Sequence, residues 1–279
     1  MGVGSQLIQN NFRSHRLPHI WCPGCGHGVI MRGVAQAIEN LKLDKEKVCI
    51  VSGIGCSSRA TGYMDFNTLH TTHGRALAFA TGVKLARPEL HVIVITGDGD
   101  ATAIGGNHLI HSARRNIDIT TIIFNNKIYG MTGGQSSPAT PYHEKGTTSP
   151  YGTIDPDFDI CKLATGAGAT YVARSTAYHV PQLIKYIQAG ISHKGFAMIE
   201  AISGCPTYYG RKNKKGDAVD MMTYYKEFAI DVKMAEKVAP EKKEGKFLIG
   251  EFINEVRAEY VDEYQKIVDS LRQEGSQDA

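Results

Sequence analysis

Two short polar turns, each directly after an apolar run, carry residue types that can bind a metal ion and a phosphate group. A Gly-Asp-Gly turn at 97–99 follows the run 91–96, and an Asn-Asn pair at 125–126 follows the run 119–124. A glycine-rich turn at the end of a buried strand lets the backbone approach an anion while the carboxylate holds a cation. Side-chain oxygens of this kind suit Mg2+, which in proteins is commonly bound together with phosphate oxygens. Either turn alone would be an ordinary loop, but the pair predicts a magnesium diphosphate site.

Four of the six cysteines form a second group, because they lie beside glycine or proline in loop-like sequence: Cys22, Cys25, Cys56 and Cys205. Such a set can bind zinc or an iron-sulfur cluster. A structural zinc site usually has two short cysteine pairs, whereas this chain has one Cys-x-x-Cys pair and two distant single cysteines. The pattern therefore favours a 4Fe-4S cluster, and four unligated thiols are the alternative.

The segments that position these residues alternate between strands and helices. We predict strands at 48–51, 91–96, 119–124, 171–173 and 196–202, and helices at 29–41, 71–86, 101–115, 157–164 and 180–192. This alternation predicts an α/β fold, a parallel sheet with helices on both faces. Ligands of such sheets gather at the carboxyl ends of the strands, so four segments should share one edge: 53–59, 97–99, 125–129 and 204–207.

The two ends of the chain do not follow the alternation. Residues 1–20 are polar and irregular, as in an arm laid across another surface, and 247–271 reads as a charged amphipathic helix. We therefore predict a ligand-binding domain at 1–205 that carries the cluster cysteines, and a helical C-terminal extension at 206–279 that serves as an interface.

Composition limits the classes of function. The chain has 279 residues, 42% of them apolar, and its 31 basic and 28 acidic residues give a net charge of +3, which makes no general case for nucleic-acid binding. No apolar run approaches the ~20 residues that span a bilayer, and the first residues lack a targeting pattern. Six cysteines are too few for a disulfide framework, and Cys49 and Cys161 lie in apolar patterns typical of buried thiols. We expect a cytoplasmic protein that binds neither nucleic acid nor membranes.

Together these motifs resemble the beta subunit of 2-oxoacid:ferredoxin oxidoreductases, most closely the 2-oxoglutarate branch. The resemblance runs from about residue 21 to residue 213 and rests on seven motifs: Cys-Pro-Gly-Cys-Gly-His at 22–27, Gly-Ile-Gly-Cys-Ser-Ser-Arg at 53–59, His-Gly-Arg at 73–75, Gly-Asp-Gly at 97–99, Asn-Asn at 125–126, Thr-Gly-Gly-Gln-Ser-Ser-Pro at 132–138 and Gly-Cys-Pro-Thr at 204–207. It implies a thiamine diphosphate-binding fold and oxidative decarboxylation of 2-oxoglutarate with coenzyme A to succinyl-CoA and CO2, or the reverse carboxylation.

Two alternatives differ from this interpretation to different degrees. A pyruvate or other 2-oxoacid:ferredoxin oxidoreductase would carry the same cofactors. A zinc-stabilised binding protein with a vestigial thiamine site would not be a redox enzyme at all. Iron and sulfide content separates this second alternative from the oxidoreductases.

The resemblance also implies roles for individual residues. Asp98 and Asn126 give side-chain oxygens to Mg2+, and Ile128 gives a backbone carbonyl. The full set of cofactor-binding residues is Ile54, Gly55, Ser57, His73, Gly97, Asp98, Gly99, Asn126, Ile128, Tyr129 and Thr132. The cluster on Cys22, Cys25, Cys56 and Cys205 takes electrons from thiamine diphosphate one at a time and passes them to ferredoxin.

Four further features have weaker claims. The Arg59 guanidinium can hold the distal carboxylate of 2-oxoglutarate or form a salt bridge at a subunit interface. His73 can contact the cofactor or substrate, or cap a helix. The basic run 211–215 can dock an acidic ferredoxin or be a solvated loop. His27, beside Cys25, is expected to pack behind the cluster.

A glutamate for the aminopyrimidine ring of thiamine is missing. Glu200 lies in a strand, five residues before Cys205, and is expected to be structural. In the family that this chain resembles, the alpha subunit supplies the glutamate. The resemblance therefore implies an obligate alpha subunit, a dimer of alpha-beta heterodimers, and a beta chain that is inactive alone.

Overall fold

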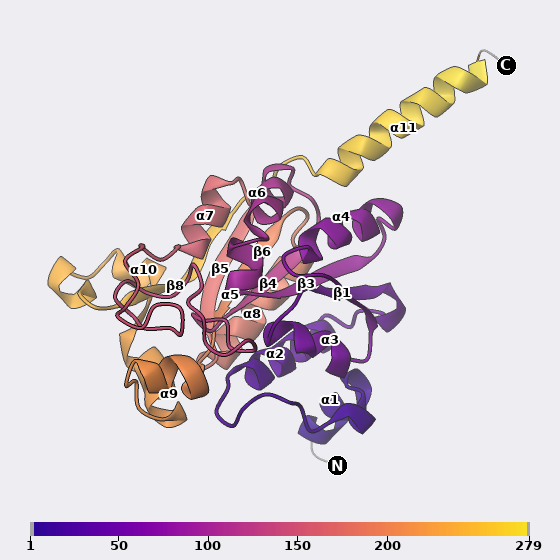
Figure 1. The fold of residues 1–279 in the computed structure, drawn as a ribbon. Helices are drawn as coiled ribbons and strands as arrows, with labels where there is room; N and C mark the ends of the chain where they lie inside the picture. The colour runs from indigo at the N-terminus through magenta and orange to yellow at the C-terminus, as the bar shows by residue number, and fades with distance from the viewer. Residues whose placement is uncertain (1–2, 278–279) are drawn as a thin grey trace.

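A sheet of eight strands forms the centre of the computed structural model, which describes residues 3–277 (Figure 1). The order across the sheet is β2-β1-β3-β4-β6-β5-β8-β7. In chain order the strands are β1 (Val48–Ser52), β2 (Asn67–His70), β3 (His91–Gly97), β4 (Thr120–Asn125), β5 (Tyr171–Thr176), β6 (Ala197–Ile202), β7 (Ala229–Asp231) and β8 (Phe247–Asn254). All neighbours are parallel except β5 and β8, which are antiparallel.

Helices cover both faces of the sheet, which explains why its middle strands are almost wholly apolar. A buried cluster on one face includes residues of α1 (Val3–Asn11), α2 (His27–Asn40), α3 (Ala60–Tyr63) and α8 (Val180–Ser192). The cluster on the other face includes residues of α4 (Ala76–Ala86), α6 (Gly106–Arg114) and α7 (Ile160–Gly166). The predicted α/β fold with two helical layers is confirmed.

The register of the sheet brings the ends of its central strands together. Gly97, the last residue of β3, pairs with Phe124 of β4, and Asn125 pairs with Ile202, the last residue of β6. The polar turns after β3, β4 and β6 therefore leave the sheet at the same edge. The short helix α5 (Asp98–Thr102) begins there.

The prediction of an irregular arm at residues 1–20 is wrong over its first half, where α1 is helical. Leu7 of α1 is buried, and Asn11 donates to the Glu39 carboxylate of α2. Short helices are stable only when one face is packed, so this polar segment is helical because it packs against α2.

The helix predicted at 101–115 is two helices, α5 and α6, with a break at residues 103–105. At this break Gly105 packs against other backbone, since a Cβ there would lie 2.3 Å from the carbonyl oxygen of Asp100. A continuous helix is therefore replaced by a tight turn that a glycine permits.

The helix predicted at 247–271 is wrong over its first half, where β8 lies, and is confirmed from residue 260 on, where α11 (Tyr260–Gln277) begins. Gly250 has a φ of +129°, which no helix accommodates, and it pairs with Arg174 of β5. The alternation continues after residue 215 with α9 (Ala218–Phe228), β7 and α10 (Val232–Ala235), and α11 then extends away from the body (Figure 1). The domain boundary at residue 205 stays a prediction.

No helix in the described part of the chain is long and apolar enough to cross a membrane. The cytoplasmic location stays a prediction.

Candidate active site

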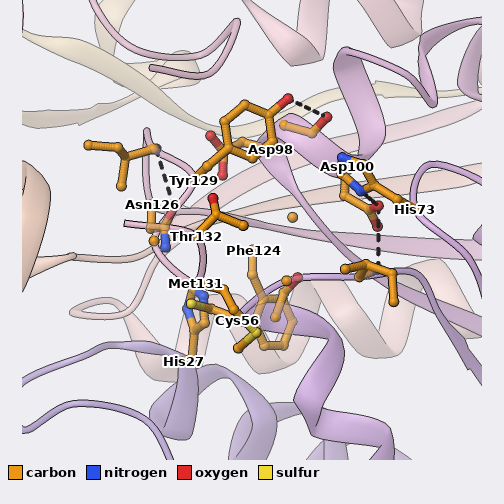
Figure 2. Close-up of a pocket in the computed structure, with 17 residues that line it drawn as sticks. His27, Cys56, His73, Asp98, Asp100, Phe124, Asn126, Tyr129, Met131 and Thr132 are labelled. Atoms are coloured by element: carbon orange, nitrogen blue, oxygen red, sulfur yellow. Dashed lines mark hydrogen bonds and ion pairs between the residues drawn. The ribbon is translucent and has the colours of Figure 1, made fainter. Parts of the chain in front are cut away.

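One pocket lies at the carboxyl edge of the sheet, beside the ends of β1, β3 and β4 (Figure 2). All the residues that the sequence predicts for cofactor binding line it: Ile54, Gly55, Ser57, His73, Gly97, Asp98, Gly99, Asn126, Ile128, Tyr129 and Thr132. The pocket also contains Cys56 and His27, from the predicted cluster region. The fold thus gathers these segments as expected, and their individual roles in binding stay predictions.

Asp98 is the central acid of the pocket. It opens α5, is buried, and its carboxylate accepts hydrogen bonds from the Ser137 hydroxyl and the Asn126 backbone N–H. Burial raises the pKa of Asp98 to about 7, and the charge of Glu200 adds to the rise. The hydrogen bonds that Asp98 accepts lower its pKa and so oppose this shift. A cation at this carboxylate would favour its charged form. The Asp98 environment therefore fits a magnesium ligand.

The Asn-Asn turn after β4 holds its own shape. The Asn125 side chain accepts from Lys127 N at 2.9 Å, and the Asn126 side chain accepts from Ile128 N at 3.3 Å. Lys127 has a φ of +64°, so the chain reverses sharply at this residue. The turn thereby places Asn126 and Ile128 in the wall of the pocket.

Tyr129 closes the pocket against Gly99. Its hydroxyl donates to the Gly99 carbonyl at 3.2 Å, and a Cβ on residue 99 would lie 2.2 Å from the Tyr129 ring. Glycine is therefore needed at 99 for the close approach of this ring, which is a physical reason for the second glycine of the Gly-Asp-Gly turn.

Ser57 provides a test of whether the pocket fits a phosphate. Its hydroxyl is buried in the wall and has no hydrogen-bond partner among the residues that the structure describes. A buried hydroxyl without a partner is costly, whereas a phosphate oxygen would satisfy it. Ser57 therefore fits a diphosphate contact.

The four loop cysteines approach one another beside the pocket, and all are free thiols. A Cβ on Gly130 would lie 3.2 Å from the Cys56 sulfur and 3.8 Å from the Cys205 sulfur. Burial raises the pKa of Cys25 to about 12 and that of Cys56 to about 11, and the thiols of Cys205 and exposed Cys22 add to both shifts.

Backbone N–H groups already point at three of these sulfurs. His27 donates to Cys25, Met131 to Cys56, and Tyr208 and Tyr209 to Cys205, in each case lowering the pKa of the thiol. Such donors stabilise thiolates, the form that ligates iron. In the described residues, however, no three His, Cys, Asp or Glu side chains are arranged to hold a metal ion. Ligation of the cluster therefore stays a prediction.

Several buried residues have structural roles in the core. Glu200 accepts from Asn125 Nδ2 at 2.7 Å and from Arg174 Nε at 2.6 Å, so it belongs to the core and not to the pocket. The expectation that Cys49 and Cys161 are buried is confirmed.

His27 is enclosed behind the cysteines, as expected. Its ring interacts with the Ser203 hydroxyl at 3.0 Å, and burial lowers its pKa to about 3. The ring is therefore neutral near pH 7, and it forms part of the packing between the cysteine loops and the pocket.

The two candidates for the reacting centre differ in position. His73 lines the pocket, and its Nδ1 lies 2.6 Å from the Asp100 carboxylate. Arg59 is exposed and is not in the pocket wall. The sequence reasoning missed Asp100, although an acid two positions after Asp98 in the same strand-end motif was a signal for it.

Residues 53–201 match the family model described as thiamine pyrophosphate enzyme, C-terminal TPP binding domain. The fold and the pocket thus define a thiamine pyrophosphate enzyme. The 2-oxoglutarate synthase subunit KorB of Methanocaldococcus jannaschii is 54% identical over 94% of this chain and 97% of that protein. KorB of Archaeoglobus fulgidus is 47% identical over 91% of this chain and 92% of that protein.

A solved structure shows the same architecture. It is the 2-oxoglutarate:ferredoxin oxidoreductase from Magnetococcus marinus with 2-oxoglutarate, coenzyme A and succinyl-CoA bound. The match has a TM-score of 0.84 at 33% identity and covers 95% of this chain and 90% of that chain. The chain belongs to the KorB family of 2-oxoacid:ferredoxin oxidoreductase beta subunits, which confirms the resemblance found in its motifs.

Proposed function

We propose that the protein is the beta subunit of a CoA-dependent 2-oxoglutarate:ferredoxin oxidoreductase. The enzyme converts 2-oxoglutarate and coenzyme A to succinyl-CoA, CO2, a proton and two electrons, or runs in reverse. The observation that carries the proposal is the pocket, which is lined by every residue predicted to bind the cofactor. The chain is also 54% identical to a 2-oxoglutarate synthase subunit. The buried carboxyl of Asp98 and the unpartnered hydroxyl of Ser57 support a cation and a phosphate there.

We assign the cofactor contacts to residues of this pocket. Asp98, Asn126 and the Ile128 carbonyl would bind Mg2+, and Ser57 and Thr132 would contact the diphosphate. When bound, thiamine diphosphate supplies an electron sink for the carbanion that remains after a 2-oxoacid loses CO2. The hydrogen bond from the Tyr129 hydroxyl to the Gly99 carbonyl holds this part of the pocket wall together.

A 4Fe-4S cluster on Cys22, Cys25, Cys56 and Cys205 would receive the electrons one at a time. Cys56 is both a predicted ligand and part of the pocket wall, so the distance from cofactor to cluster would be short. Iron, sulfide and zinc analysis of anaerobically purified protein tests this assignment. Four irons and four sulfides per chain are expected for a single cluster, whereas zinc without iron would favour the binding-protein alternative.

Activity should require an alpha subunit, and the assembly we propose is a dimer of alpha-beta heterodimers. Glu200 is occupied by Asn125 and Arg174, so this chain offers no glutamate there for the aminopyrimidine ring. The test is co-expression with the alpha subunit and CoA-dependent ferredoxin reduction across a panel of 2-oxoacids. Faster turnover of pyruvate than of 2-oxoglutarate would overturn the substrate assignment.

Arg59 is the candidate in this chain for the distal carboxylate of 2-oxoglutarate. Its exposed position lies outside the pocket wall, so contact with substrate would need the alpha subunit to close over it. Arg59→Gln in the alpha-beta complex should raise the KM for 2-oxoglutarate more than the KM for pyruvate, which lacks that carboxylate. Equal changes for both substrates would favour a salt bridge at the interface.

We also propose that an acidic ferredoxin docks on the basic loop that follows Cys205. Arg211, Lys212 and Lys214 are exposed, and Lys215 forms an ion pair with Glu144 at 2.6 Å. The fold adds Lys145 to this patch, because its backbone is hydrogen-bonded to the Asn213 side chain.

Charge reversal tests this docking surface. Lys212→Glu with Lys214→Glu should raise the KM for ferredoxin and weaken its salt dependence, with little change in the KM for 2-oxoglutarate. Lys47→Glu is the matched control, because Lys47 is exposed directly before β1, at the opposite edge of the sheet. Equal effects of both changes would contradict the docking surface.

A further inference from the structure

Asp100 is buried in α5, two residues after Asp98, and its carboxylate accepts hydrogen bonds from three separate segments. Oδ1 lies 2.6 Å from His73 Nδ1 and 2.7 Å from Gly74 N. Ile54 N also donates to Oδ1, at 3.4 Å, and the Thr96 hydroxyl donates to Oδ2 at 2.7 Å. This one carboxylate therefore joins the loop after β1, the loop before α4 and the end of β3.

Two glycines allow this convergence. A Cβ on Gly53 would lie 2.0 Å from Asp100 Oδ2, so any side chain at 53 would displace the carboxylate. Gly74 has a φ of +67°, and a Cβ there would lie 2.7 Å from Gly105 N. The surrounding backbone is thus built closely around the Asp100 side chain, which is not a solvated acid.

The contact determines which nitrogen of His73 is available. A carboxylate only accepts hydrogen bonds, so Nδ1 must carry the proton that it donates to Asp100. The other ring nitrogen, Nε2, is not used in this contact and has no hydrogen-bond partner in the part of the chain that the structure describes. His73 lines the pocket and its side chain is 40% exposed, so the ring is accessible to a bound molecule (Figure 2).

We propose that Asp100 is a positioning residue, which holds the His73 ring so that Nε2 makes a hydrogen bond to the reacting 2-oxoacid. The inference rests on the proposed function, since it takes a 2-oxoacid as the molecule in the pocket. Asp100 acts only through His73, and His73 is the residue that touches substrate. The pair thus extends the catalytic site beyond the cofactor ligands.

Asp100→Asn tests the role of the charge, because the amide can keep the contacts to His73, Gly74 and Thr96 with similar geometry. In the alpha-beta complex it should lower kcat for 2-oxoglutarate by about 10-fold to 100-fold, as removal of orienting partners of catalytic groups typically does. The KM and the Kd for thiamine diphosphate should stay within about threefold, because the lost interaction acts on the reaction and not on cofactor binding.

Two further variants make the test specific. Thr81→Val removes a hydrogen bond within α4, from the Thr81 hydroxyl to the Leu77 carbonyl at 2.8 Å, without touching Asp100 or His73, and its kcat should stay near that of the wild type. Asp100→Asn combined with His73→Gln should be no slower than His73→Gln alone, because the two residues act as one unit. Multiplied losses, an unchanged kcat in Asp100→Asn, or an equal loss of thiamine diphosphate affinity would overturn the proposal.

A failure of the proposed function gives a different result. In that case the wild-type complex would turn over no 2-oxoglutarate. Crystal structures of the wild-type and Asp100→Asn complexes would then decide whether Asp100 orients His73. A His73 ring whose Nδ1 does not face residue 100 in the wild type would overturn the inference by itself.

Discussion

Gly99→Ala tests whether close packing against Tyr129 shapes the cofactor turn. The added Cβ would lie 2.2 Å from Tyr129 Cε1 and 2.3 Å from Cζ. Favourable carbon contacts are about 3.5 to 4.0 Å apart, so the ring must move by more than about 1 Å. This movement breaks the hydrogen bond from Tyr129 to the Gly99 carbonyl and shifts the neighbouring Ile128, whose carbonyl we assign to Mg2+.

The expected cost combines three contributions. Overpacking costs about 1 to 3 kcal/mol, and loss of the hydrogen bond costs about 1 kcal/mol. The better helix propensity of alanine returns about 1 kcal/mol, because residue 99 is helical. We therefore expect a net loss of about 1 to 3 kcal/mol, a lower Tm and weaker binding of thiamine diphosphate with Mg2+.

The assay compares the Tm of the alpha-beta complex with its Kd for thiamine diphosphate. Gly99→Ala with Tyr129→Leu should recover part of the lost stability, since the shorter side chain lacks the ring atoms that clash. Gly82→Ala is the control: this glycine lies within α4, and a Cβ there meets nothing within 4 Å. Wild-type stability and affinity in Gly99→Ala would refute the steric argument.

Three further perturbations test other parts of the site. Burial raises the pKa of Asp98 to about 7, so the ligand-free protein binds a proton on folding and its free energy of unfolding falls as pH rises from about 4 to 7. Asp98→Asn should lack this loss. The same pH dependence of the unfolding free energy in variant and wild type would contradict the prediction. Ser57→Ala should leave the ligand-free Tm equal or higher, because it removes an unsatisfied hydroxyl, yet weaken thiamine diphosphate binding; a lower Tm with unchanged affinity would be the opposite result. Arg174→Met should lower the unfolding free energy by about 3 to 5 kcal/mol, because it leaves Glu200 buried without its ion-pair partner. Adding Glu200→Gln should recover part of this loss. No recovery would mean that the broken ion pair is not the cause of the lost stability.

The strand ends and their chemistry could be predicted because they are local features of the sequence. An apolar run followed by Gly-Asp-Gly or Asn-Asn indicates a buried strand and the polar turn after it. Parallel pairing then places such turns at one edge, so Asp98 and Asn126 could be assigned to one pocket before any register was known.

Other features needed the tertiary structure, since their causes lie far apart in the chain. The role of Asp100 depends on His73, which is 27 residues away, and β8 is a strand because it pairs with β5. The sequence by itself determined the motifs of a thiamine pyrophosphate enzyme and the residue types of its site. Only the fold decided which nitrogen of His73 bonds to Asp100, because a hydrogen bond between a loop and a helix further along the chain has no local signature.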